Sequence, residues 1–142
     1  MATRTRQFFY DAVGNRTKTI DPDGRTTYYT YDKVNRLTGI SVDPDSKTAD
    51  YYFDKRGLVA TEVKPNSAVT YYEYDDAGRM TKLDNRKSDL SLISSFEYDR
   101  DKSGNITKCY RGDTATIYYT YDKALRLASE VWKDSGMSTI YS

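Results

Sequence analysis

Residues 28–38 read Tyr-Tyr-Thr-Tyr-Asp-Lys-Val-Asn-Arg-Leu-Thr, and this stretch contains the features that decide the fold. Tyr29 and Tyr31 are separated by one residue, so in a β-strand their side chains point to the same face. Asp32 is a residue type favoured at the first position of a type I turn. Asn35 tolerates the left-handed conformation that closes a three-residue hairpin loop with a bulge. The stretch therefore predicts a β-hairpin whose first strand ends at Tyr31.

The same pattern recurs along the whole chain. An aromatic residue followed by Asp occurs six times, at intervals of 21 to 24 residues. The residue two positions before this aromatic is also aromatic in every copy, whereas the residue between them varies, which is typical of a strand with one specified face. The predicted structural residues of the six units are Tyr10, Asp11 and Gly14; Tyr31, Asp32 and Asn35; Phe53, Asp54 and Gly57; Tyr74, Asp75 and Gly78; Tyr98, Asp99 and Gly104; and Tyr121 and Asp122.

Two units depart from the pattern. The fifth has two more residues between Asp99 and Gly104, so we expect a longer turn there. The sixth has Leu125 at the left-handed position, which we expect to strain or remodel its turn. In five of the six units the aromatic is expected to face an apolar residue on the returning strand, such as Leu37 or Val59, whereas in the first unit the partner is Arg16. In the fifth unit that partner is expected to be Ile106 for Tyr98.

Turn-forming residues also separate the units. These links contain Pro, Gly, Asn, Asp and Ser, which favour turns: they are residues 21–24, 43–46, 64–67, 85–89, 111–113 and 133–136. Each unit is therefore one hairpin plus a link. The sequence predicts an all-β fold, in which tandem hairpins form one curved antiparallel sheet, a partial shell or spiral strip of about twelve strands. We expect one domain over residues 1–142, with a truncated seventh unit at its C-terminus.

The composition excludes several function classes. The 142 residues contain no His, so the commonest general base and the commonest metal ligand are both missing. Cys109 is the only cysteine, and we expect it to be a small strand residue without a catalytic role. The net charge is +1, which argues against a dedicated nucleic-acid binder, and no apolar stretch is long enough to insert into a membrane. The sequence thus predicts no enzyme activity, no catalytic residue, no metal site and no cofactor.

The six units resemble the YD repeat of the rearrangement-hotspot (Rhs) proteins, which also occurs in wall-associated bacterial proteins, Tc-toxin shells and teneurins. The similarity covers about residues 7–142, and six units in register make it specific. The resemblance implies hairpins that build a hollow β-shell, which in bacterial members encloses a C-terminal toxin segment. Six units are too few for a closed shell, so we expect this chain to be a segment of a larger protein or a small stand-alone relic of one.

The main functional expectation is a non-enzymatic structural segment that encapsulates or scaffolds a toxin or cell-surface domain. Its expected partners are neighbouring YD repeats of a parent chain, or other copies that pair with the free edges of the sheet. The resemblance implies a bacterial parent protein that is secreted or at the cell surface, although this chain shows no signal peptide.

The alternative is a surface module that binds carbohydrate or protein through exposed rows of aromatic rings. The regular aromatics that precede each Asp are expected to pack within the sheet. The irregular aromatics lie on the opposite face of the predicted strands and are the candidate ligand-binding residues: Phe9, Tyr28, Tyr52, Tyr71 and Tyr118.

Overall fold

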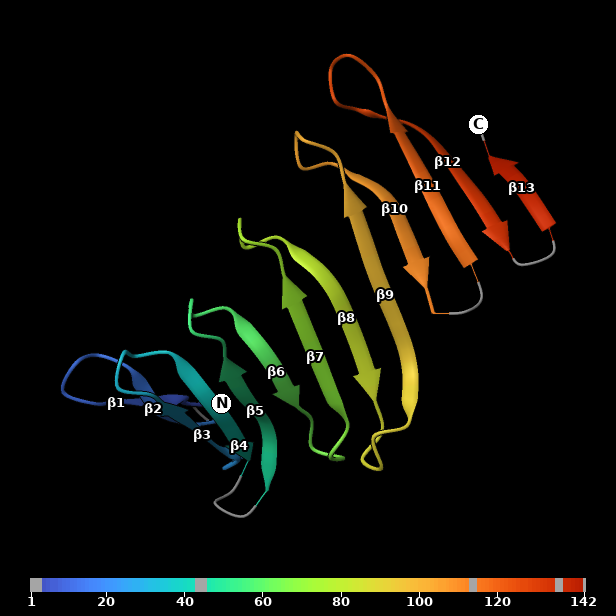
Figure 1. Ribbon diagram of the computed structural model, residues 1–142. Coiled ribbons are helices and arrows are strands. Elements are labelled where there is room, and N and C mark those ends of the chain that lie inside the picture. Colours follow the sequence, from blue (N-terminus) through green and yellow to red (C-terminus); the bar gives the residue numbers. More distant parts are fainter. Residues whose placement is uncertain (1–3, 43–45, 113–114, 135–136, 142) are drawn as a thin grey trace. The chain divides into compact units, whose positions relative to one another are not determined.

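The structure, a computed structural model, describes residues 4–42, 46–112, 115–134 and 137–141. These residues form antiparallel strands that follow one another in the sheet in chain order, from β1 to β13, which confirms the predicted all-β class (Figure 1). The strands are β1 (Gln7–Tyr10), β2 (Arg16–Ile20), β3 (Thr26–Tyr31), β4 (Leu37–Val42), β5 (Lys47–Phe53), β6 (Val59–Val63), β7 (Val69–Tyr74), β8 (Met80–Arg86), β9 (Leu92–Arg100), β10 (Ile106–Arg111), β11 (Ala115–Tyr121), β12 (Leu127–Asp134) and β13 (Met137–Tyr141).

The predicted hairpin register is confirmed in the first, second, third and sixth repeats. Tyr31 pairs with Leu37, and the register shifts by one residue immediately beside this pair, as expected for a bulge that closes a three-residue loop. The same shift accompanies the pairs Tyr10–Arg16, Phe53–Val59 and Tyr121–Leu127. The aromatic face therefore continues across each of these hairpins.

The fifth repeat differs from the prediction. Tyr98 pairs with Cys109, and Ile106 pairs with Arg100 instead of Tyr98. Strand β9 continues to Arg100, so the two additional residues extend the strand and do not lengthen the turn. The expectation of a longer turn between Asp99 and Gly104 was wrong.

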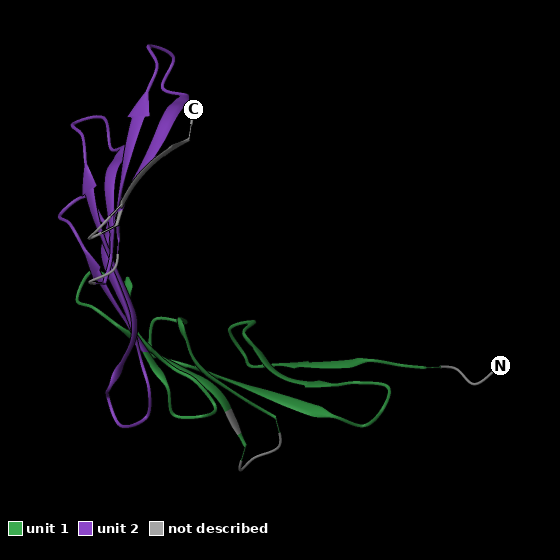
Figure 2. Cartoon of the chain, turned by 90° about the vertical axis from the view of Figure 1, so that its right-hand side faces the viewer, with its two compact units in different colours: residues 1–69 green, residues 70–142 purple. Residues whose placement is uncertain are grey.

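The chain forms two compact units, residues 1–69 and residues 70–142 (Figure 2). Within the second unit, the turns that follow the Asp residues lie at one end of the strands, and the links between repeats lie at the opposite end (Figure 1). The expectation of a single domain over the whole chain stays a prediction.

Three links between repeats, at residues 21–25, 64–68 and 87–91, adopt the same turn geometry as the turns inside the repeats. In the first link, Asp21 N donates to Arg25 O at 2.9 Å and Gly24 N donates to Asp21 O at 2.9 Å. The link expected at residues 85–89 is formed two residues later, between Lys87 and Ser91, because β8 continues to Arg86. The links at residues 43–46, 111–113 and 133–136 lie partly outside the described residues.

Few side chains are deeply buried. Among the described residues, the buried apolar side chains are Ala49, Cys109 and Ile117, and no large side chain is completely removed from solvent. A sheet with so little buried apolar volume depends on contacts between neighbouring strands for its stability. No described residue belongs to a helix that is long and apolar enough to cross a membrane.

Candidate functional site

The candidate site is the recurring turn, here called the YD turn, which runs from the turn Asp to the residue four positions later. In the second repeat, Asp32 N donates to Arg36 O at 2.9 Å, and Asn35 N donates to Asp32 O at 3.1 Å. The Asp32 side chain completes the turn, because its Oδ1 accepts bonds from Val34 N at 2.9 Å and Arg36 N at 3.0 Å. Each turn Asp therefore acts as a local organiser of backbone N–H groups.

The six turn carboxylates share this environment. The turn residues are Asp11, Asp32, Asp54, Asp75, Asp101 and Asp122. The bond from the Arg79 backbone N–H, together with bonds from its side chain, holds the pKa of Asp75 below the usual value. Asp122 has a lowered pKa for the same reason, with Arg126 as the donor. These carboxylates are thus committed to the turns as anions, which leaves them poorly suited to proton transfer.

The residue four positions after the turn Asp is a part of the motif that the sequence interpretation missed. Arg36 Nε donates to Asp32 Oδ2 at 2.7 Å, and Arg79 Nε donates to Asp75 Oδ2 at 2.7 Å. Asparagine does the same in the first repeat, where Asn15 Nδ2 donates to Asp11 Oδ2 at 3.0 Å. The available signal was the recurrence of Asn or Arg at this position, which is found in five of the six turns.

Neighbouring YD turns are also in contact. Asn15 Nδ2 donates to Asn35 Oδ1 at 2.9 Å, which links the first two turns. In the next pair, Arg36 passes so close to Gly57 that a Cβ atom there would lie 3.3 Å from its Nη1. Glycine at this position therefore serves two purposes, since its φ of 88° suits a residue without Cβ and its small size admits the arginine.

The fifth turn begins at Asp101, not at the predicted Asp99. Asp101 N donates to Asn105 O at 3.0 Å, and Gly104 N donates to Asp101 O at 3.0 Å. Asp99 lies on strand β9, where its Oδ2 accepts a bond from the Tyr110 hydroxyl at 3.0 Å. The assignment of Asp99 as a turn residue was wrong, because the true repeat position is occupied by the non-aromatic pair Arg100-Asp101.

The sixth turn keeps the common geometry although Leu125 occupies the left-handed position. Leu125 has a φ of 60°, and its N–H donates to Asp122 O at 2.9 Å. The expected remodelling is therefore absent, and the leucine adopts a conformation that costs a non-glycine residue free energy. Leu90 and Ser67 adopt the same conformation in two of the links.

The residue immediately before the turn Asp is here called the flanking residue, and in the second and sixth repeats it bridges to the preceding repeat. The Tyr31 hydroxyl donates to Arg16 O at 3.0 Å, and the Tyr121 hydroxyl donates to Ile106 O at 2.8 Å. Tyr10, which precedes the first turn, is 61% exposed, whereas the other flanking aromatics Tyr31, Phe53, Tyr74 and Tyr121 are half-buried. Tyr98 lies two residues before Arg100 and is also half-buried.

The candidate ligand-binding aromatics are distributed over both compact units. Phe9 and Tyr28 both pair with Lys18, whose Nζ lies 4.1 Å from the centre of the Phe9 ring. Tyr52 and Tyr71 are exposed, at 57% and 38%, and Tyr118 is half-buried beside Lys133 Nζ at 4.8 Å from its ring centre. Ligand binding by these rings stays a prediction.

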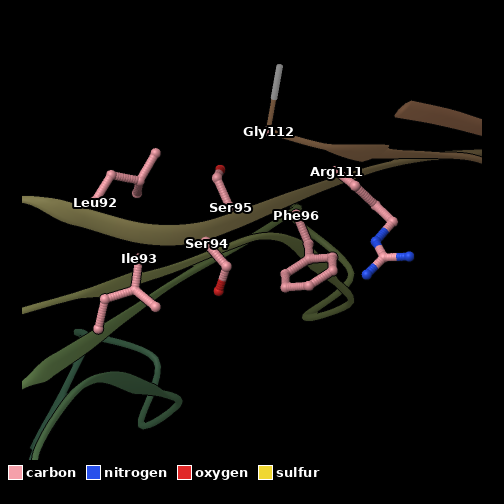
Figure 3. Close-up of a pocket in the computed structure, with 7 residues that line it drawn as sticks. All are labelled: Leu92, Ile93, Ser94, Ser95, Phe96, Arg111 and Gly112. Atoms are coloured by element: carbon pink, nitrogen blue, oxygen red, sulfur yellow. The ribbon is translucent and has the colours of Figure 1, made fainter. Parts of the chain in front are cut away.

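Two shallow cavities lie within the second unit. The larger, of about 380 Å³, is lined by Leu92, Ile93, Ser94, Ser95, Phe96, Arg111 and Gly112, with Arg111 and Phe96 on one side of it (Figure 3). The smaller, of about 200 Å³, is lined by Tyr98, Ile106, Tyr119, Tyr121 and Leu127. In the larger cavity the Ser95 hydroxyl donates to Asp84 Oδ1 at 2.6 Å, and this bond lowers the pKa of the Asp84 carboxyl, which makes the carboxylate a weaker base. The described residues also contain no group of three or more Cys, Asp or Glu side chains that could hold a metal ion.

The one thiol is buried. Cys109 is 6% exposed, and burial raises the pKa of its thiol. Burial likewise raises the pKa of the neighbouring Tyr98 hydroxyl. A thiolate nucleophile is therefore not favoured at this position.

Comparison with known proteins agrees with this geometry. Residues 10–48 match the family model described as RHS Repeat. No curated protein matches the chain. Among solved structures, the crystal structure of TcdB2–TccC3–Cdc42 superimposes with a TM-score of 0.82 at 21% identity over 89% of this chain. The Photorhabdus luminescens Tc holotoxin pore gives a TM-score of 0.79, also at 21% identity over 89% of this chain.

The chain spans only 7% of the length of these solved chains, so the likeness concerns one stretch of much larger proteins. At this level of identity it establishes the fold. The resemblance indicated by the six aromatic–Asp units is confirmed: residues 10–48 match the RHS repeat, and the fold of the chain is one that occurs in the TcdB2–TccC3 toxin structures.

Proposed function

We propose that this chain is a non-enzymatic wall segment of a larger Rhs/YD-repeat protein, and that the wall encloses or scaffolds a toxin or cell-surface domain. The observation that carries the proposal is the contact between successive turns, in which Asn15 binds Asn35 and Arg36 passes over Gly57. Such contacts join each hairpin to its neighbour and can be repeated without limit, which suits a structure built by adding repeats.

The proposed partners are further YD repeats of the parent chain at the free strand edges, or a second copy of the chain. Edge strand β1 is exposed at every residue from Gln7 to Tyr10, and an uncovered edge readily accepts another strand. The proposed location is a secreted or surface-exposed bacterial protein, by analogy with the Tc holotoxin pore.

The first test asks whether a parent protein exists. An antibody raised against residues 1–142 is used to determine the mass of the native polypeptide in the source cells. A band far above 16.4 kDa supports a wall segment of a larger protein. A band near 16.4 kDa overturns that part of the proposal.

The second test addresses enclosure directly. The purified parent is digested with protease, and the survival of its C-terminal segment is followed by mass spectrometry. Gly39→Val should open the wall and expose the segment, since a Cβ at Gly39 would lie 2.7 Å from Thr30 Oγ1. Tyr52→Ala removes an exposed ring and should leave protection unchanged. Equal protection of the C-terminal segment in the unmodified parent, in Gly39→Val and in Tyr52→Ala would contradict enclosure. Saturable glycan binding that is lost in Tyr52→Ala would contradict a purely structural role.

A further inference from the structure

The backbone pairing between consecutive hairpins ends before the strands reach the YD turns. Between β2 and β3 the last pair on this side is Lys18–Tyr28. Between β10 and β11 it is Lys108–Tyr118, and between β8 and β9 it is Lys82–Glu97. Each junction between hairpins therefore has an end that the ladder of backbone hydrogen bonds does not close.

One side chain closes this end at three junctions. Tyr31 Oη donates to Arg16 O at 3.0 Å, across β3 and β2. Tyr121 Oη donates to Ile106 O at 2.8 Å, across β11 and β10. In both cases the donor lies three residues after the last paired residue of its own strand. The acceptor lies two residues before the last paired residue of the other strand.

The third junction uses different chemistry to reach the same acceptor position. Arg100 Nη2 donates to Met80 O at 3.1 Å. Arg100 again lies three residues after the last paired residue of its strand, Glu97, and Met80 lies two residues before Lys82. A phenol and a guanidinium share little besides a hydrogen-bond donor at the end of a long side chain. The carbonyl acceptor is thus the common feature of the junction, and the flanking residue is selected as its donor.

The junction between β4 and β5 lacks this donor. Its last pair is Gly39–Asp50, so the corresponding flanking residue is Phe53 and the corresponding acceptor is Leu37 O. Phenylalanine has no hydroxyl, and the Phe53 ring is instead covered by the Arg36 guanidinium at 4.3 Å. We infer that the flanking side chain is a staple between consecutive hairpins, and that the β4–β5 junction, which Phe53 leaves without a staple, opens more readily than the stapled β2–β3 junction in the same unit.

The test is amide hydrogen exchange, measured by NMR on the complete chain. Phe53→Tyr adds one hydroxyl and should slow exchange at residues 37–41 and 49–53 by roughly threefold to tenfold, the range expected for one hydrogen bond. Tyr31→Phe removes the hydroxyl at the neighbouring junction and should speed exchange at residues 16–20 and 26–31 by a similar factor. Tyr52→Phe is the matched control, because it removes the hydroxyl of an exposed tyrosine next to Phe53.

The inference holds if the unmodified chain exchanges faster at β4–β5 than at β2–β3, and if Phe53→Tyr reduces this difference. It is overturned if Phe53→Tyr leaves exchange at residues 37–41 unchanged, or if Tyr31→Phe behaves like Tyr52→Phe. Because Phe53→Tyr adds an interaction, its result does not depend on whether the loss variant stays folded.

Discussion

Arg100 donates a hydrogen bond to the carbonyl oxygen of Met80 at 3.1 Å, at the position where the other junctions use a tyrosine hydroxyl. A second nitrogen of Arg100 donates to Gly104 O at 3.1 Å within the same hairpin. One side chain thus holds both its own YD turn and the preceding repeat. This relationship explains how the fifth repeat keeps its structure without the aromatic residue.

Arg100→Met should destabilise the second unit by about 1.5–3 kcal/mol, the range for hydrogen bonds made by a charged group. The loss is expected because Met80 O and Gly104 O both lose their donor. Urea denaturation gives the free energy of unfolding. Lys102→Met, an exposed change in the same turn, should have little effect, and an equal loss in both variants would count against the bridging role.

Gly39→Ala should destabilise the first unit by about 1–3 kcal/mol, because the added methyl group overfills a tight site. The new Cβ would lie 2.7 Å from Thr30 Oγ1 and 3.2 Å from Asp50 Oδ1. In the double variant Gly39→Ala/Thr30→Ala the clash with Oγ1 disappears, so thermal unfolding should show partial recovery. Strictly additive losses would mean that Thr30 is not the obstacle.

Leu125→Gly should stabilise the sixth turn by a net of about 0.5 kcal/mol. Glycine avoids roughly 1–2 kcal/mol of left-handed strain, but it also gains conformational freedom in the unfolded chain. The control Ala124→Gly, at the preceding turn residue, gains only the unfolded freedom and should be destabilising. Thermal denaturation of both variants separates the two effects, and a loss of stability in Leu125→Gly would contradict the strain assigned to Leu125.

Stability should fall as the pH drops through the acidic range. The turn carboxylates have pKa values below the ordinary 3.8, so the unfolded state takes up protons first and the folded state loses stability as the pH falls below about 5. The unfolding midpoint in urea, followed from pH 7 to pH 2.5, should therefore decrease. Asp75→Asn should flatten this decrease, and an unchanged decrease in this variant would contradict the assignment.

Cys109 should be protected from alkylation in the folded chain. It is buried, and burial raises the pKa of its thiol, so few thiolates are available at neutral pH. Mass spectrometry after iodoacetamide treatment should show slow modification in buffer and rapid modification in urea. Rapid modification without denaturant would show that the strands around Cys109 open frequently.

The sequence predicted the hairpin order and most of the registers because the alternation of aromatic residues and the turn Asp act locally. Tyr31 illustrates this, since its pairing with Leu37 follows from the turn alone. The position of the fifth turn was missed because Tyr98-Asp99 mimics the aromatic–Asp pair, although Asp101 keeps the spacing to Gly104 that Asp11 has to Gly14. The pairing of Arg100 with Ile106 excludes a turn at Asp99. The bond from Tyr31 to Arg16 O could not be foreseen, since it depends on where two separate hairpins stop pairing.

The link between β8 and β9 has a consequence for how such repeats vary in length. The backbone pair Lys18–Tyr28 flanks the link between β2 and β3, and its two residues are ten positions apart in the sequence. The equivalent pair at the link between β8 and β9, Lys82–Glu97, is fifteen positions apart. Two of the five additional residues lie on β8 and three on β9, where a register shift between the pairs Asn85–Ser94 and Arg86–Leu92 leaves Ile93 unpaired. A strand can therefore accept an insertion of two residues, because two residues return every side chain to its own face of the sheet. A single additional residue must be left unpaired in a β-bulge. Natural insertions in the strands of this chain should obey this parity rule, whereas the YD turns, which run from the turn Asp to the fourth residue after it in all six repeats, should keep a constant length.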